Sequence, residues 1–423
     1  MKKATILLVL LVTNFPLLWA QLTISADISP RAELRHGYRV LPMEGEKAAA
    51  LVSQRTRLIL SWSMENLRTH ISFHDFRVWG QEAQRQFNPS LAIHEAWAEL
   101  DLSREISLKA GRQELKYDNQ RFFAFNDWLP MGQKHDVLLI KYTLPDMSFH
   151  FGSAFNQPSI AYQRNFTMEY GINNYKYMNF AWFNTTLNDS GKLSVLAVAD
   201  GYEFSDGTQF DPEVLYVRGT WSALLRQEAG EFSLMINPAL QHGRNRSGQS
   251  IRAWYFRGEA TRSTLENTNS TLGLEIFSGN NTASEHYGTF DPLYGAGHAN
   301  NGFMDYFTLI PQHTSNAGLI NPFLKNRTQI SGKAQFGAAL HLFFIQSTYM
   351  YENEALPKYL GTEIDLTLTY RFNPSVRIIG GLSWMFASES MEIINRGSQI
   401  GSSDEPAYFA YVMMRIRPKL FEQ

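Results

Sequence analysis

Alternation of apolar and polar side chains in short segments is the feature that most restricts how this chain can fold. Residues 361–371 show it most clearly: Ile364, Leu366, Leu368 and Tyr370 share one face, and polar residues share the other. Because side chains of a β-strand alternate between two faces, each such segment can separate an apolar environment from a polar one. The same alternation occurs in residues 55–62, 94–102, 215–222 and 408–417.

A membrane helix is not expected, since no stretch after the first residues reaches about 18 consecutive apolar residues. Only 18% of the residues are charged and 13% are aromatic. Aromatic residues form belts around transmembrane barrels at both membrane surfaces. Backbone groups in a bilayer must be paired within the protein, so strands can cross it only as a closed barrel. Trp62, Trp79, Trp182, Trp221 and Trp384 are predicted to belong to these belts, with stacking on sugar rings as the alternative.

The first 20 residues have the pattern of a secretory signal peptide. Lys2 and Lys3 are followed by a mostly apolar run, residues 4–18, and Ala20 offers a small residue for cleavage. Residues 1–20 are therefore predicted to be removed, leaving Gln21 as the new N-terminus. The chain has no cysteine, which excludes disulfides, cysteine-bound metals and a lipoprotein anchor.

Turn signals divide the rest of the chain into one all-β domain, residues 21–423. Short polar turns such as residues 188–191, 228–231 and 373–375 alternate with longer polar stretches. At roughly 22 residues for each strand with its connection, the fold class expected is a single antiparallel transmembrane β-barrel of about 18 strands. Residues 278–331 interrupt the pattern, and we expect one or two strands there together with a loop that narrows the pore.

One polar and aromatic stretch, Gly111–Trp128, lies between two strand-like segments. Arg112 and Arg121 stand among acidic residues with which they could pair, and aromatic residues follow. This mixture predicts a turn folded over a polar cavity.

Three motifs resemble the alginate-export family of outer-membrane β-barrels. The first is Gly-Arg-Gln-Glu-Leu with Tyr-Asp, Gln-Arg and Asn-Asp-Trp in residues 111–128. The second is Phe-Asp-Pro-Leu-Tyr-Gly-Ala-Gly-His with Gly, Met and Asp in residues 290–305, and the third is Gly-Thr-Glu-Ile-Asp-Leu-Thr-Leu-Thr-Tyr in residues 361–370. The resemblance implies a barrel of similar size that exports alginate or a related anionic polysaccharide.

Charged residues on the predicted inner face supply the candidate pore residues. Arginines there are interpreted either as a lining for an anionic polymer or as partners of acids that stiffen the barrel. The net charge of −2 does not favour a polyanion conduit. The candidates for pore lining or substrate binding are Arg55, Arg57, Arg112, Glu114, Arg121, Asp127 and Arg371. Strand parity places Arg112 outward unless a bulge at Gly111 intervenes.

Patterns for enzymatic chemistry are weak. Asp291, Asp305, His286 and His298 match no metal-ligand spacing, and His94-Glu95 is not followed by a second histidine. No catalytic residue, metal, cofactor or nucleic-acid partner is expected.

The sequence therefore predicts a passive, monomeric channel in the outer membrane of a Gram-negative bacterium. Its expected partners are outer-membrane lipid, an anionic polysaccharide and periplasmic export or assembly proteins. An outer-membrane barrel enzyme and a secreted β-rich carbohydrate-binding protein are the alternatives.

Overall fold

A computed structural model describes residues 21–86, 88, 90–157, 174–264, 267–280, 285–395 and 401–423. The predicted signal peptide, residues 1–20, lies outside the described residues.

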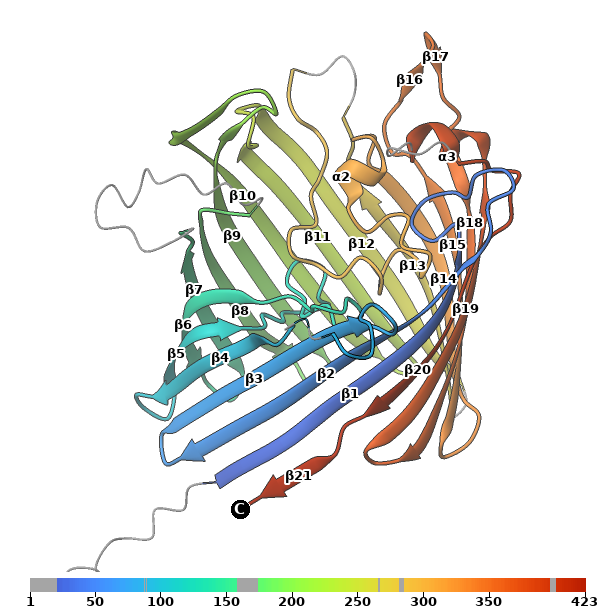
Figure 1. The fold of residues 1–423 in the computed structure, drawn as a ribbon. Coiled ribbons are helices and arrows are strands. Elements are labelled where there is room, and N and C mark those ends of the chain that lie inside the picture. The colour runs from blue at the N-terminus through green and yellow to red at the C-terminus, as the bar shows by residue number, and fades with distance from the viewer. Residues whose placement is uncertain are drawn as a thin grey trace, which may run out of the picture.

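The strands form one antiparallel sheet that closes into a barrel of 18 strands (Figure 1). Each strand pairs with its neighbour in the chain, and β1 closes the barrel by pairing with β2 and with the last segments, β20 and β21. Because β20 and β21 occupy one position in the wall, the 19 hydrogen-bonded segments make 18 strands. In chain order they are β1 (Gln21–His36), β2 (Ala49–Met64), β3 (Leu67–Val78), β4 (Ala92–Asp101), β5 (Ile106–Gln113), β6 (His135–Thr143), β7 (Met147–Phe155), β8 (Tyr177–Asn188), β9 (Gly191–Ser205), β10 (Phe210–Ala229), β11 (Phe232–Arg244), β12 (Ser250–Thr264), β13 (Thr268–Phe277), β14 (Leu319–Gln329), β15 (Ala334–Phe344), β18 (Tyr359–Asn373), β19 (Val376–Ala387), β20 (Ala407–Ile416) and β21 (Lys419–Glu422).

Short turns and long loops lie at opposite ends of the barrel, as the sequence predicts (Figure 1). The turn end also carries the start of β1 and the C-terminus. At the loop end, one loop contains the small hairpin β16 (Met350–Tyr351) and β17 (Glu354–Ala355), and two others contain the helices α2 (Ile310–His313) and α3 (Glu389–Ile394). No helix among the described residues is long and apolar enough to cross a membrane.

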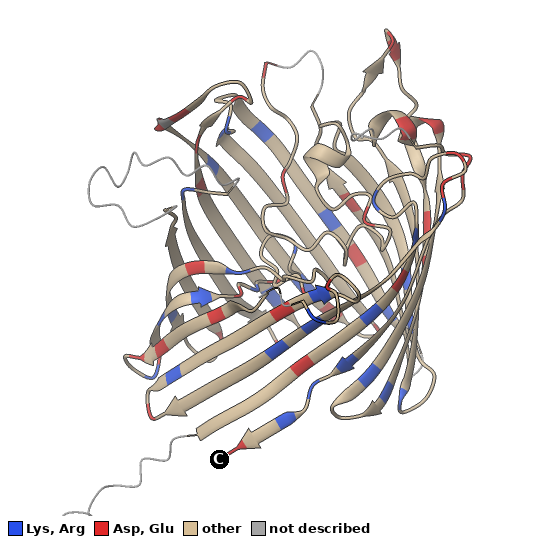
Figure 2. Ribbon diagram, viewed as in Figure 1, with Lys and Arg blue, Asp and Glu red and all other residues tan. Residues whose placement is uncertain are grey.

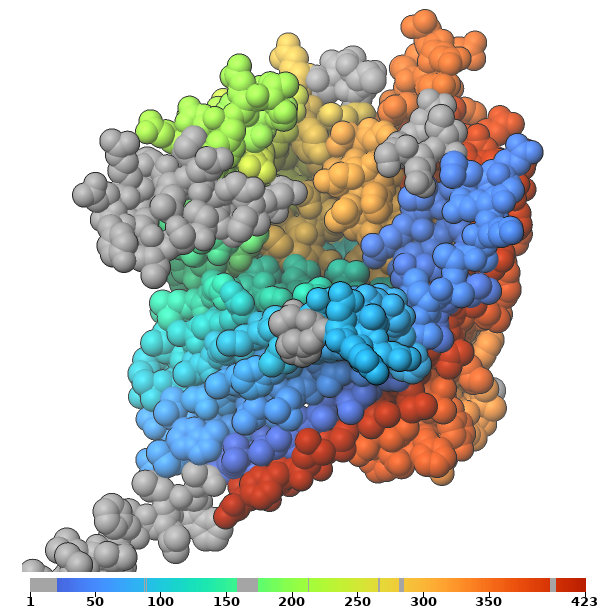
Figure 3. All heavy atoms as spheres, in the orientation of Figure 1, coloured from blue at the N-terminus to red at the C-terminus, as the bar shows by residue number. Residues whose placement is uncertain are grey.

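The two faces of the wall differ in polarity as predicted. On β18, Glu363 and Asp365 are at most 2% exposed inside the barrel, whereas Leu368 and Tyr370 are exposed outside it. Charged residues occur along the strands of the wall (Figure 2). The space-filling view shows β1 lying directly against β20 and β21, where the barrel closes (Figure 3). Exposed leucine, isoleucine and aromatic side chains from most strands give the outer face the apolar surface that lipid requires.

One tryptophan departs from the predicted belt. Trp182 points into the lumen, where its Nε1–H donates to Asp118 Oδ1 at 2.9 Å and its ring packs beside Tyr117. It faces inward because β8 alternates with Met178 and Phe180 buried on the inner face. Trp221 and Trp384, in contrast, are exposed on the outer face.

Candidate functional site

Two long loops fold into the barrel and join each other inside it. Residues 114–134 connect β5 to β6, and residues 278–318 connect β13 to β14 (Figure 1). Phe123 and Tyr294 form an isolated parallel β-bridge. The amide of Tyr294 donates to the carbonyl of Phe122 at 3.0 Å, and the amide of Ala124 donates to the carbonyl of Tyr294 at 3.0 Å. The loop expected between residues 278 and 331 therefore enters the barrel and is joined there to a second loop; its narrowing of the pore stays a prediction.

The contact between the loops is close enough to require glycine. A Cβ atom on Gly295 would lie 1.9 Å from the carbonyl oxygen of Arg121. The ring of Trp128 also stacks on the ring of His298, with centroids 3.9 Å apart. The guanidinium of Arg31, on the barrel wall, lies 4.0 Å from the centroid of the Trp128 ring. Backbone, aromatic and cation–π contacts together fix the two loops against β1.

Arg121 anchors the loops to the wall and does not line an open pore. Its side chain is 1% exposed, and its Nε lies 2.8 Å from Oε1 of Glu275 on β13. Glu275 also accepts hydrogen bonds from Tyr255 and Arg257, at 2.7 and 3.0 Å. On the loop side, Arg121 donates to Asn301 Oδ1 at 3.2 Å. Arg121 therefore fits the second interpretation of the arginines in this barrel, in which they pair with acids and stiffen the structure.

Asp127 brings together several of the predicted residues. Its carboxylate lies 2.8 Å from Arg55, 2.7 Å from Arg415 and 3.2 Å from Arg417, with Arg57 at 4.0 Å. Burial favours the neutral acid, but the surrounding arginines outweigh it and hold the pKa of Asp127 below its ordinary value. The tip of the loop is thus docked electrostatically on β2 and β20.

Glu114 lies in the lumen at the start of the same loop. Its Oε1 lies 2.8 Å from Nε2 of His94 and 3.6 Å from Arg57. Arg57 also donates from Nε to Nδ1 of His74 at 3.1 Å. Arg55, Arg57, Glu114 and Asp127 therefore form one connected polar network on this side of the lumen.

Arg112 lies apart from this network, on the outer face. It pairs with Asp136 on β6, at 2.8 and 2.9 Å, and its side chain is 41% exposed. The ladder between β4 and β5 runs through Gly111 without a register shift. The bulge that would have turned Arg112 inward is absent from this ladder, so we do not include Arg112 in the proposed pore lining.

Arg371 lies at the turn end, in a row of basic residues. It is directly opposite Arg377 on β19, and Arg377 is directly opposite Arg415 on β20. These residues line a cavity of about 520 Å³ together with Lys333 and Arg417. Arg371 lies on the same inward face of β18 as Glu363 and Asp365, nearer the turn end.

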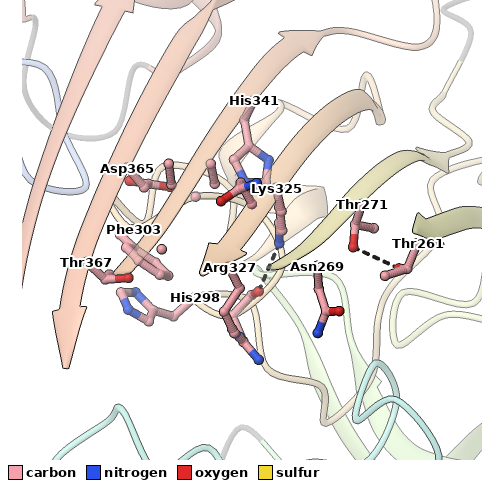
Figure 4. A pocket seen from close by; sticks show the side chains of 16 residues that line it. Thr261, Asn269, Thr271, His298, Phe303, Lys325, Arg327, His341, Asp365 and Thr367 are labelled. Carbon is pink, nitrogen blue, oxygen red and sulfur yellow. Dashed lines mark hydrogen bonds between the residues drawn. The ribbon is translucent and has the colours of Figure 1, made fainter. Parts of the chain in front are cut away.

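A second cavity of about 320 Å³ lies beside the loop of residues 278–318 (Figure 4). Lys325 and Arg327 on β14 line it, as does Asp365 on β18. Hydroxyl and amide side chains complete much of its wall: Thr261, Asn269, Thr271 and Thr367. We call this cavity the side chamber; its groups can donate several hydrogen bonds to an oxygen-rich solute.

The three sequence motifs meet beside this chamber. The amide of Met304 donates to Oε1 of Glu363 at 2.7 Å, and Gly302 packs so closely that a Cβ atom would lie 2.4 Å from that carboxylate. His298 bonds Asp305 at 2.6 Å and stacks on Trp128 of the first motif. The motifs are therefore parts of one assembly that fastens the inward loops to β18.

Several lumen residues were missed by the sequence analysis: Arg31, Lys325, Arg327, Lys333 and Arg377. A signal for Arg377 was present, because a short turn at residues 373–375 forces Arg371 and Arg377 to face each other. Arg31 also had a signal, because apolar and polar residues alternate regularly along β1 and place it with Asp27 and Glu33. Lys325 and Arg327 belong to a strand whose alternation is weak, and Lys333 lies in a turn.

Several solved structures share this fold, and the first of them is described as an outer membrane protein. The chain is similar to OpdK of Pseudomonas aeruginosa, with 13% identity, a TM-score of 0.59 and coverage of 94% of this chain and 98% of that one. It is also similar to OccK11 (OpdR) of the same organism, with 12% identity, a TM-score of 0.60 and coverage of 95% and 96%. It is similar as well to OccAB4 of Acinetobacter baumannii, with 9% identity, a TM-score of 0.61 and coverage of 95% of this chain and 98% of that one. No curated protein matches the sequence.

The closed wall, its apolar outside and the loops in its charged lumen define a channel-type β-barrel of the outer membrane. The profile of the family described as alginate export matches residues 20–390, which is most of the chain. The protein belongs to the alginate-export family, as its three motifs indicated.

Proposed function

We propose that this barrel conducts anionic solutes, with acidic polysaccharides or their fragments as the class that the family name indicates. The observation that carries the proposal is a set of lumen cations without acidic partners. No ion pair among the described residues reaches Lys325, Arg327, Lys333, Arg371 or Arg377.

The facing pair of Arg371 and Arg377 is the strongest part of this set. Like charges directly opposite each other on neighbouring strands destabilise a sheet. Neither side chain has a partner among the described residues that would offset the repulsion. A mobile anion passing the turn end would supply the missing negative charge.

The side chamber continues this basic surface along β14 and β18. Thr367 and Arg371 lie on the same face of β18, four residues and therefore about 13 Å apart. Lys325 and Arg327 offer charge in the chamber, and its threonines offer hydroxyl groups. A solute that carries carboxylates and hydroxyls, as a uronic acid does, matches both kinds of group.

One solved structure of this fold was determined together with a carboxylate, which supports the proposal. A structure of OpdK, which is 12% identical and has a TM-score of 0.57, was determined with vanillate, a monocarboxylate. The competing proposal is a channel with little charge preference. The arginines around Asp127 favour it because neighbouring acids offset most of their positive charge.

The working unit is proposed to be a monomer, since the barrel closes on itself. Partners in the periplasm would meet the turn end, where the basic cavity opens among the short turns. The proposed step is passive passage, without a covalent reaction.

Solute entry into liposomes tests the proposal. Protein-containing liposomes should admit glucuronate faster than glucose, and the double substitution R371Q/R377Q should remove this preference. A matched control, R262Q, neutralises an arginine that pairs with Glu231 and is 53% exposed near the same end, so the preference should persist. Equal entry of the two sugars into wild-type liposomes would refute an anion channel.

A further inference from the structure

A histidine and two glutamates converge at the base of the loop of residues 114–134. One ligand atom each from His94, Glu95 and Glu114 lies within 4.8 Å of the other two. Nε2 of His94 is 2.8 Å from Oε1 of Glu114, and the histidine is 1% exposed. We call these three residues the loop-base cluster.

A strand irregularity creates the cluster. In the ladder between β3 and β4, Ser72 pairs with Glu95 and Phe73 pairs with Ile93, so His94 is an extra residue. Such a bulge re-aims side chains. Here it sends His94 inward next to Glu95, although successive residues of a regular strand face opposite sides. The amide of Glu114 donates to Oε1 of Glu95 at 3.1 Å and completes the arrangement.

Imidazole nitrogens and carboxylate oxygens are the ligands of divalent transition-metal ions such as Zn²⁺, and three protein ligands leave a position open for water. A second observation also indicates a ligand. Nδ1 of His94 is buried and has no hydrogen-bond partner among the described residues. His70 adds another imidazole, 3.3 Å from Oε2 of Glu95.

Nearby cations oppose a metal ion at this place. Arg57 lies 3.6 Å from Oε1 of Glu114, and Lys109 lies over the ring of Trp97, whose Nε1–H bonds Glu95 at 3.2 Å. The two carboxylates offset these two positive charges. The site should therefore bind a metal ion with moderate affinity.

We propose that the loop-base cluster binds a divalent transition-metal ion of the Zn²⁺ class. The ion would link β4 to the first residue of the loop that carries Arg121 and Asp127. Metal binding would therefore stiffen the loop that narrows the lumen. This site is separate from the basic row and the side chamber, and it does not depend on which solute passes.

Calorimetric titration of the purified, detergent-solubilised protein with ZnCl₂, after removal of any affinity tag, tests the proposal. One ion per chain should bind, and H94Q and E114Q should each weaken binding by at least about tenfold. H242Q is the matched control, since His242 is exposed and accepts a hydrogen bond from Trp221 instead; it should bind like the wild type. Absence of a one-to-one phase, or binding unchanged in H94Q and E114Q, would overturn the proposal.

A spectroscopic measurement keeps the test decisive if those variants fail to fold. X-ray absorption of the Zn²⁺-loaded wild type should show nitrogen and oxygen neighbours at about 2.0–2.2 Å, with an imidazole scattering pattern. In single-channel records, Zn²⁺ should reduce fluctuations of the open current in the wild type and in H242Q. A shell of oxygen atoms alone would contradict ligation by His94.

Discussion

The guanidinium of Arg121 lies 2.8 Å from the carboxylate of Glu275, and both side chains are at most 1% exposed. This pair joins the tip region of one inward loop to the barrel wall. It matters for function because the same loop continues to Asp127, the acid at the centre of the arginine cluster.

Removing one member of this pair should free the loop. In R121M, the buried carboxylate of Glu275 keeps Arg257 as a partner but loses Arg121. Breaking a buried ion pair typically lowers the free energy of unfolding by about 3–5 kcal/mol. We expect a lower unfolding temperature in detergent and larger fluctuations of the single-channel current. Unchanged stability and unchanged current would contradict the anchoring function of Arg121.

Substituting Gly295 should separate the two inward loops. The Cβ atom of G295A would overlap the carbonyl of Arg121, so the backbone must shift, at a cost of about 1–3 kcal/mol. Thermal unfolding monitored by heat-dependent gel mobility measures this loss. The control is G332A, because a Cβ atom on Gly332 meets nothing within 4 Å; a loss of equal size in both variants would reject the close contact.

Neutralising Asp127 should raise selectivity for anions. D127N removes the negative charge that offsets Arg55, Arg415 and Arg417, so more positive charge faces the lumen. The reversal potential in a salt gradient should shift toward that of chloride. D189N, in an exposed turn, should leave it unchanged. An unchanged reversal potential in D127N would show that this cluster does not face the conducting path.

The stabilising effect of Asp127 should depend on pH. Its pKa is lowered in the folded protein, since the arginines favour the charged form more than burial disfavours it. The effect is therefore complete above the ordinary pKa of 3.8 and disappears as the pH falls through the lower, folded-state value. The difference in unfolding temperature between wild type and D127N should shrink as the pH is lowered from 6 to below about 3.8. A difference that grows on acidification would contradict this linkage.

Alternation predicted the wall of the barrel because lipid and lumen impose opposite demands on neighbouring side chains. Residues 361–371 illustrate this, since each predicted face of β18 is observed. Strand parity also placed Arg112 outward, where it pairs with Asp136. The opposing expectation, that Arg112 lines the pore, relied on a bulge that the ladder lacks.

Contacts inside the lumen were harder to predict because they join distant parts of the chain. Arg121 and Glu275 are 154 residues apart, and no local pattern reveals which acid an arginine in a loop will meet. The loop-base cluster depends on a bulge at His94, which shifts the alternation by one residue and so hides the histidine from a count of inward positions.

The most direct test of anion conduction is the ion selectivity of single wild-type channels in a planar bilayer, with alginate added afterwards. We expect a reversal potential near that of chloride and a current that alginate blocks, with the block weakened in R371Q/R377Q and retained in R112Q. A reversal potential near that of the cation, with no effect of alginate, would contradict it.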